Sequence, residues 1–121
     1  MTHLVKTSDV LKLNVTGREG EKLGVVREAF VDLMSGRVEF LIIEANSLLG
    51  MGKFHPVPWS IVRFDELDNA FKAPVTKDEF KASPSYDRDQ LSDTNYGWNE
   101  QAIKYFAANA MPAETIPPLS S

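Results

Sequence analysis

The residues of this chain that could carry out chemistry are few and widely spaced. It has two histidines, His3 and His55, and no cysteine. A zinc or other transition-metal site needs three or four suitable ligands, so this set does not predict a metal centre. Ser60 lacks the Gly-x-Ser-x-Gly surround of a nucleophile elbow, and neither histidine is placed as its evident base. We therefore expect no cofactor, no metal and no catalytic residue, and a protein that is not an enzyme.

Two further patterns also favour structural roles. The segment Gly50-Met51-Gly52-Lys53 resembles a fragment of a phosphate loop, but it lacks the long glycine spacing, the Lys-Ser/Thr pair and the following helix. An acid/base pair would need one desolvated carboxylate. The candidates fall instead on expected turns and strand edges, where we interpret them as solubilising charges: Glu19, Glu21, Glu28 and Asp32.

An apolar loop is the strongest candidate for an interaction site. Leu48, Leu49 and Met51 lie where a solvated turn would normally be polar. Contiguous exposed apolar side chains mark an interface. These could also fold back over the mouth of the small β-barrel predicted below, or contact the helix expected around Trp98. Trp59, just after a proline, could anchor a partner or plug the end of the barrel, and the large area of an indole favours the plug.

Composition narrows the class of protein. The net charge is −4, with 13 Lys and Arg against 17 Asp and Glu. Since phosphate binding needs clustered basic residues, nucleic acid is not expected as a direct partner. The sequence lacks a signal-peptide pattern and any apolar run near the ~18 residues of a spanning helix. The lack of cysteine fits a reducing compartment. We expect a cytoplasmic protein without membrane insertion.

Short strands dominate the first part of the chain. The most apolar, residues 37–45, has β-branched and aromatic residues in a run too short for a helix, which predicts a strand buried on both faces. Further strands are expected at residues 13–16, 22–32, 54–57, 61–64 and 70–73. Their close spacing predicts a mainly β fold, a small six-stranded antiparallel barrel over residues 8–75.

The chain changes character at Thr76, where a capping box with Glu79 predicts a short helix through Ala82. A polar tether (83–94) should follow, then a helix capped at residue 93 or 94 that ends near residue 108. One apolar face of this helix must dock on a barrel: Trp98, Ala102, Tyr105 and Phe106. We expect the extension 76–110 to dock on the third strand or the 46–53 loop, in its own chain or exchanged within a homodimer, and residues 111–121 to be a disordered tail.

Several short motifs follow one another in the chain: Gly20-Glu21-Lys22-Leu23-Gly24, Asp32, Gly36-Arg37-Val38, Leu49-Gly50-Met51-Gly52 and Val57-Pro58-Trp59-Ser60. Their order and spacing resemble one family, the PRC-barrel domains. They include the cytoplasmic domain of the photosynthetic reaction centre H subunit and the C-terminal domain of the ribosome maturation factor. The resemblance covers about residues 8–75. The segment 82–87 before the final helix is similar to the extension of stand-alone bacterial members.

The resemblance implies a six-stranded barrel-like fold used mainly for protein contacts, with no catalytic residues to carry over. Our leading hypothesis is a non-enzymatic interaction module that binds a protein partner, or itself as a homodimer, through the 46–53 loop and the adjacent barrel surface. Two alternatives stay open: a regulator of an electron-transfer or membrane complex, by analogy with the H subunit, and a barrel that binds a small ligand.

Overall fold

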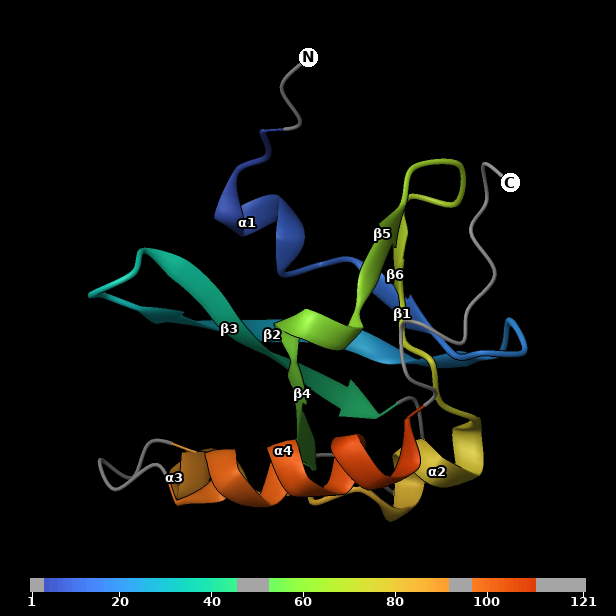
Figure 1. The fold of residues 1–121 in the computed structure, drawn as a ribbon. Coiled ribbons are helices and arrows are strands. Elements are labelled where there is room, and N and C mark those ends of the chain that lie inside the picture. The colour runs from blue at the N-terminus through green and yellow to red at the C-terminus, as the bar shows by residue number, and fades with distance from the viewer. Residues whose placement is uncertain (1–3, 46–52, 92–96, 111–121) are drawn as a thin grey trace.

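The computed structural model describes residues 4–45, 53–91 and 97–110. Within these ranges the chain forms six strands and four α-helices with one 3₁₀ turn (Figure 1). The strands are β1 (Asn14–Thr16), β2 (Lys22–Asp32), β3 (Arg37–Ala45), β4 (Phe54–Pro58), β5 (Arg63–Asp65) and β6 (Ala70–Lys72). The helices are α1 (Thr7–Val10), α2 (Lys77–Ala82), α3 (Arg88–Leu91) and α4 (Trp98–Asn109), and the 3₁₀ turn η1 spans Trp59–Ile61.

The strands form one mixed sheet in the order β4-β3-β2-β1-β6-β5. The mainly β fold with six strands is confirmed, but the prediction of an all-antiparallel barrel is wrong. Strands β1 and β6 run parallel, with Val15 opposite Phe71, and the described strands leave β4 and β5 at the two ends of an open sheet. A local pattern cannot reveal this pairing, because parallel neighbours are joined by a long crossover, which here contains most of the sheet.

Two prolines explain why the sheet ends at β4. Phe54 exchanges backbone hydrogen bonds with Tyr86 on the side away from β3. Because backbone groups alternate along a strand, Pro56 and Pro58 face the same outer side as Phe54. Neither proline has an N–H to donate, so this edge cannot receive a further full strand. The resulting edge is covered by the Tyr86 bridge and by α4, which packs against β4.

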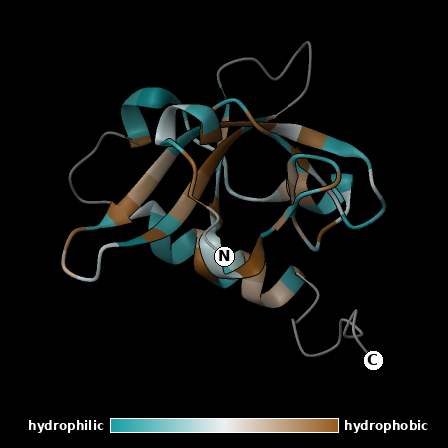
Figure 2. Cartoon of the chain, turned by 90° about the horizontal axis from the view of Figure 1, so that it is seen from above, coloured by the Kyte–Doolittle hydropathy of each residue, from teal (hydrophilic) through white to brown (hydrophobic). Residues whose placement is uncertain are grey.

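Strand β3 is the centre of the fold, with the bounds that the sequence predicted. Its residues from Phe40 to Ile43 are all buried, so both faces of the strand are covered. Leu41 and Ile43 belong to the main core, whereas Phe40 and Ile42 belong to a second cluster on the opposite face. Hydrophobic segments accordingly run along the strands through the middle of the molecule (Figure 2).

The helices cover the sheet unequally. In Figure 1, α2, α3 and α4 lie together on one side of the strands, and α1 lies on the other. The second cluster joins β3 and β4 to the later helices and contains Phe40, Ile42, Phe54, Leu91, Trp98 and Ala102. Phe80 of α2 and Phe106 of α4 instead reach the main core. The helical extension is therefore continuous with the interior of the domain.

Two segments differ from the sequence prediction. The strand expected at residues 61–64 is displaced, because the chain first forms the 3₁₀ turn η1 and pairs only as β5. The expected tether at residues 83–94 contains α3, which the prediction missed. Its signal was present in the sequence: the side chains of Asp87 and Gln90 accept hydrogen bonds from each other's backbone N–H, the reciprocal pattern of a capping box.

The capping box that begins α2 is confirmed. The Thr76 hydroxyl accepts the N–H of Glu79 at 3.1 Å, and the Glu79 carboxylate accepts the N–H of Thr76 at 2.8 Å. Helix α4 begins at Trp98, after Gly97 at its N-cap. The caps predicted at residues 93 and 94 lie outside the described residues, as does the tail from residue 111 onward.

Candidate functional site

An aromatic surface lies near the β5 end of the sheet. Trp59 of η1 and Phe64 of β5 both place their rings edge-on against Phe71 of β6, with ring centroids 5.7 Å and 5.5 Å from it. Phe71 is 4% exposed and belongs to the main core, whereas Trp59 is 40% and Phe64 46% exposed. We call Trp59 and Phe64 the aromatic surface. It consists of two rings held by a buried third ring, each with a large part facing solvent.

Trp59 thus combines features of both alternatives considered for it. Its ring covers a core residue, as a plug would, but it is too exposed to be a core residue itself. The sequence pattern that drew attention to Trp59 gave no sign of Phe64, which comes from a neighbouring strand. Their common contact with Phe71 depends on the β5–β6 pairing, where Phe64 lies directly opposite Phe71.

The other interaction residues predicted from sequence, Leu48, Leu49 and Met51, lie outside the described residues. The apolar face predicted for α4 does lie within the described residues. Trp98, Ala102 and Phe106 are buried.

Their contacts place α4 on the third strand of the same chain. The Trp98 ring meets the edges of Phe30 on β2 and Phe40 on β3, with centroids 5.0 Å and 5.1 Å apart. Tyr105 is partly buried and donates its hydroxyl hydrogen to the Glu79 carbonyl at 2.5 Å. Burial raises the Tyr105 pKa, and the nearby Glu79 charge raises it further.

The structure also brings together a histidine and a serine that sequence reasoning did not connect. His55 Nδ1 lies 2.9 Å from the Oγ of Ser83, and both side chains are buried. The Ser83 hydroxyl donates to the Phe80 carbonyl at 2.5 Å, so its oxygen accepts a hydrogen bond from His55 Nδ1–H. A general base would have to accept the serine proton instead. The arrangement therefore joins β4 to the end of α2 and does not activate Ser83 as a nucleophile.

Burial explains the protonation state of this histidine. The His55 ring packs at a tilt against the Phe80 ring, with centroids 4.4 Å apart, away from solvent. Desolvation lowers its pKa from 6.5 to about 4, so the imidazole is neutral at physiological pH. His3, the other histidine, lies outside the described residues, and Ser60 is an exposed residue of η1.

Two of the carboxylates considered as an acid/base pair, Asp32 and Glu21, accept local backbone hydrogen bonds in turns. Asp32 accepts the backbone N–H groups of Met34 and Ser35 in the β2–β3 turn. Glu21 accepts the N–H of Glu19 in the preceding turn. Among residues 4–45, 53–91 and 97–110, no three His, Asp or Glu side chains gather as a metal site. In the same ranges, every helix is too short or too polar to cross a bilayer.

Comparison with known families now identifies the domain. The family model of the PRC-barrel domain matches residues 3–80. The chain belongs to this family. The comparison with curated proteins gives no match. The match of the family model confirms the resemblance inferred from the sequence landmarks.

Three glycines in these PRC-barrel landmarks are required for two different structural reasons. Gly20 and Gly36 adopt positive φ angles of 88° and 74° in turns, a conformation that favours glycine. At Gly24 the limit is space, since a Cβ there would lie 2.1 Å from the Glu44 carbonyl oxygen on the neighbouring strand. These positions shape the β1–β2–β3 meander and take no part in the aromatic surface.

Proposed function

We propose that this PRC-barrel domain is a non-enzymatic interaction module that docks a protein partner through the aromatic surface of Trp59 and Phe64. The observation that carries the proposal is the shared support of both rings by Phe71. A supported ring loses little conformational entropy on binding and offers a large contact area. Tryptophan in particular is enriched among residues that dominate binding energy at interfaces.

The neighbouring backbone supports the same function. Strand β5 is the last strand of the sheet, and in the described part of the chain it pairs only with β6. An extended segment of a partner can add to such an edge and place apolar side chains against Phe64. Since β5 has only three residues, the backbone contribution is small and the two aromatic rings carry most of the affinity.

Charges on the β5 edge limit unspecific strand pairing. Lys72 forms a salt bridge with Asp65 at 3.2 Å, and both residues alternate with Phe64 and Phe71 along their strands, so this ion pair lies on the opposite face of the β5–β6 pair. Charged side chains of this kind discourage edge-to-edge aggregation and favour a partner with matching polar groups. The partner is a different protein in our proposal, and a second copy of this chain would be recognised in the test as self-association through the same residues.

The test compares two double variants of the full chain. Trp59→Ser with Phe64→Ser removes the aromatic surface, whereas Leu33→Ser with Ile103→Ser removes two apolar residues, 91% and 50% exposed, from other surfaces. Proteins that co-purify from native cells are quantified for wild type and both variants. The principal partner is then purified, and its affinity is measured by calorimetry.

We expect the partner to be retained by the control variant and lost by the aromatic variant, with at least about a tenfold weaker affinity. Sedimentation of each protein alone reports self-association in the same way. Equal partner binding and equal oligomeric state in all three proteins would contradict the proposal.

A further inference from the structure

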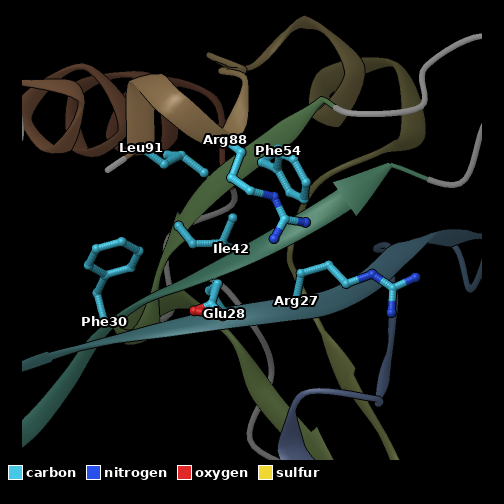
Figure 3. A pocket seen from close by; sticks show the side chains of 7 residues that line it. All are labelled: Arg27, Glu28, Phe30, Ile42, Phe54, Arg88 and Leu91. Carbon is cyan, nitrogen blue, oxygen red and sulfur yellow. The ribbon is translucent and has the colours of Figure 1, made fainter. Parts of the chain in front are cut away.

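A pocket of about 480 Å³ lies on the face of the sheet that carries the second hydrophobic cluster (Figure 3). Its apolar lining comes from three strands and α3: Phe30, Ile42, Phe54 and Leu91. Arg27, Glu28 and Arg88 complete the lining. This volume is within the range of about 300–1,000 Å³ found for small-ligand sites, and so is the mixture of an apolar body with a few polar groups.

A β-bulge builds one wall of this pocket. The pairing register between β2 and β3 shifts between Val26 and Glu28, so Arg27 is the extra residue. Val26 faces the main core, and without the bulge Glu28, two residues later, would face it as well. The shift turns Glu28 to the opposite face, where it pairs with Ile42 and lines the pocket. The bulge thus places charged groups beside an apolar floor.

The two arginines lie differently in the pocket. Figure 3 shows Arg88 extending from α3 over the Phe54 ring toward the middle of the pocket, while the Arg27 guanidinium points away from it. The Arg88 Cζ lies 5.4 Å from the Phe54 centroid, which orients the guanidinium over the ring. Arg27 is held by Glu44, with 2.7 Å between Nε and Oε1. Arg88 is therefore the cation that faces the interior of the pocket.

We propose that this pocket binds a small molecule with a carboxylate head and an apolar body, such as a medium-chain fatty acid. The carboxylate pairs with the Arg88 guanidinium, whose five N–H donors allow a bidentate contact in addition to contacts with the protein. The apolar body lies against Phe30 and the small exposed parts of Phe54 and Leu91. Glu28 on β2 repels the negative head, which directs the carboxylate toward Arg88 on α3. This site is separate from the aromatic surface and goes beyond the proposed function.

Octanoate is a suitable probe, with 1-octanol as the uncharged analogue and acetate as the head group alone. Calorimetry on the full chain should give one octanoate per chain with a Kd of about 1 mM or tighter, and much weaker binding of acetate. Amide chemical-shift changes should concentrate at Glu28, Phe30 and Leu91. Octanol should bind at the same place but more weakly, because it lacks the charge that Arg88 recognises.

Variants of exposed residues separate the charge effect from folding. Arg88→Gln should weaken octanoate binding about tenfold or more and leave octanol unchanged, because it removes a charged hydrogen-bond donor. Arg63→Gln makes the same change of net charge on β5 and should leave octanoate binding unchanged. Glu28→Gln should strengthen octanoate binding, since it removes a like charge from the wall.

The results can overturn the proposal in three ways. Octanoate and octanol could bind equally, Arg88→Gln could behave like Arg63→Gln, or octanoate could leave the amide shifts at the pocket unchanged at millimolar concentration. The variant without Trp59 and Phe64 should still bind octanoate, so failure of this inference is distinguishable from failure of the proposed interaction function.

Discussion

The buried His55 makes a prediction about acid stability that the structure allows us to quantify. Its pKa is lowered from 6.5 to about 4 by burial, so the folded state resists protonation while the unfolded chain does not. Above pH 6.5 the imidazole is neutral in both states and its burial does not make the free energy of unfolding depend on pH. Between pH 6.5 and 4 the unfolded state binds a proton that the folded state does not. The free energy of unfolding therefore decreases as the pH is lowered.

The expected size of the effect follows from this difference. The slope is about 1.4 kcal/mol per pH unit inside the window, which gives about 3.4 kcal/mol in total. From pH 7 to pH 5 the loss attributable to His55 is about 2 kcal/mol, and few carboxylates titrate in that interval. The full contribution of the neutral imidazole is thus present above pH 6.5 and lost as the pH falls through 4.

The informative variant is His55→Asn, because an amide N–H can replace the Nδ1–H that donates to Ser83 but cannot take up the proton. Urea unfolding at pH 7, 6 and 5 should show this variant losing about 2 kcal/mol less than wild type between the first and last values. His3→Ala serves as the control and should keep the wild-type slope. The reasoning is refuted if His55→Asn follows the wild-type pH dependence, or if the His55 ring titrates near 6.5 by NMR.

Four further substitutions test the packing described above, each measured by chemical denaturation at pH 7. Thr76→Ala should cost about 1 kcal/mol through loss of the α2 capping box, and Thr76→Ser should restore most of it; equal stability of all three proteins would contradict this role. Trp98→Ala should cost about 3–5 kcal/mol because it empties the contact between α4 and the sheet, whereas a loss below about 1 kcal/mol would mean that the helix is an independent appendage. Tyr105→Phe should cost about 1 kcal/mol for the lost hydroxyl contact, and an unchanged midpoint would argue against that hydrogen bond. Gly24→Ala should cost about 1–3 kcal/mol because the new methyl meets the backbone of β3; Gly97→Ala, which has open space around it, is the neutral control, and similar values for both would exclude the steric explanation.

Local features of the fold could be predicted from the sequence where a few adjacent residues determine the structure. The β3 strand follows from its run of β-branched and aromatic residues. The turn before it follows from Asp32, whose carboxylate accepts a backbone N–H, and from Gly36, which adopts a positive φ. The capping box of α2 likewise depends on two residues three positions apart. Such signals lie within a single turn or strand, so one sequence is enough to recognise them.

The features that could not be predicted depend on contacts between distant segments. Val15 and Phe71 become neighbours only when β1 and β6 pair. The same holds for His55 and Ser83, which are 28 positions apart, and for the aromatic surface, which needs β5 beside β6. In each of these contacts, the local sequence around one residue does not predict which residue it will contact. The short helix α3 is a different case, because its reciprocal Asp87–Gln90 cap is a local signal that lies within a polar stretch.

The parallel pairing of β1 with β6 also determines the order in which the fold can be completed during synthesis. Strands β2 and β3 form a local hairpin, which needs only a short loop to close. Strand β1 instead waits for Phe71, opposite Val15, before its second edge is paired. Closing so long a segment costs entropy that local contacts do not repay until the core assembles. A nascent chain that ends before β6 therefore exposes the β1 edge, and residues through Lys72 must be synthesised before the sheet can close its last long-range contact.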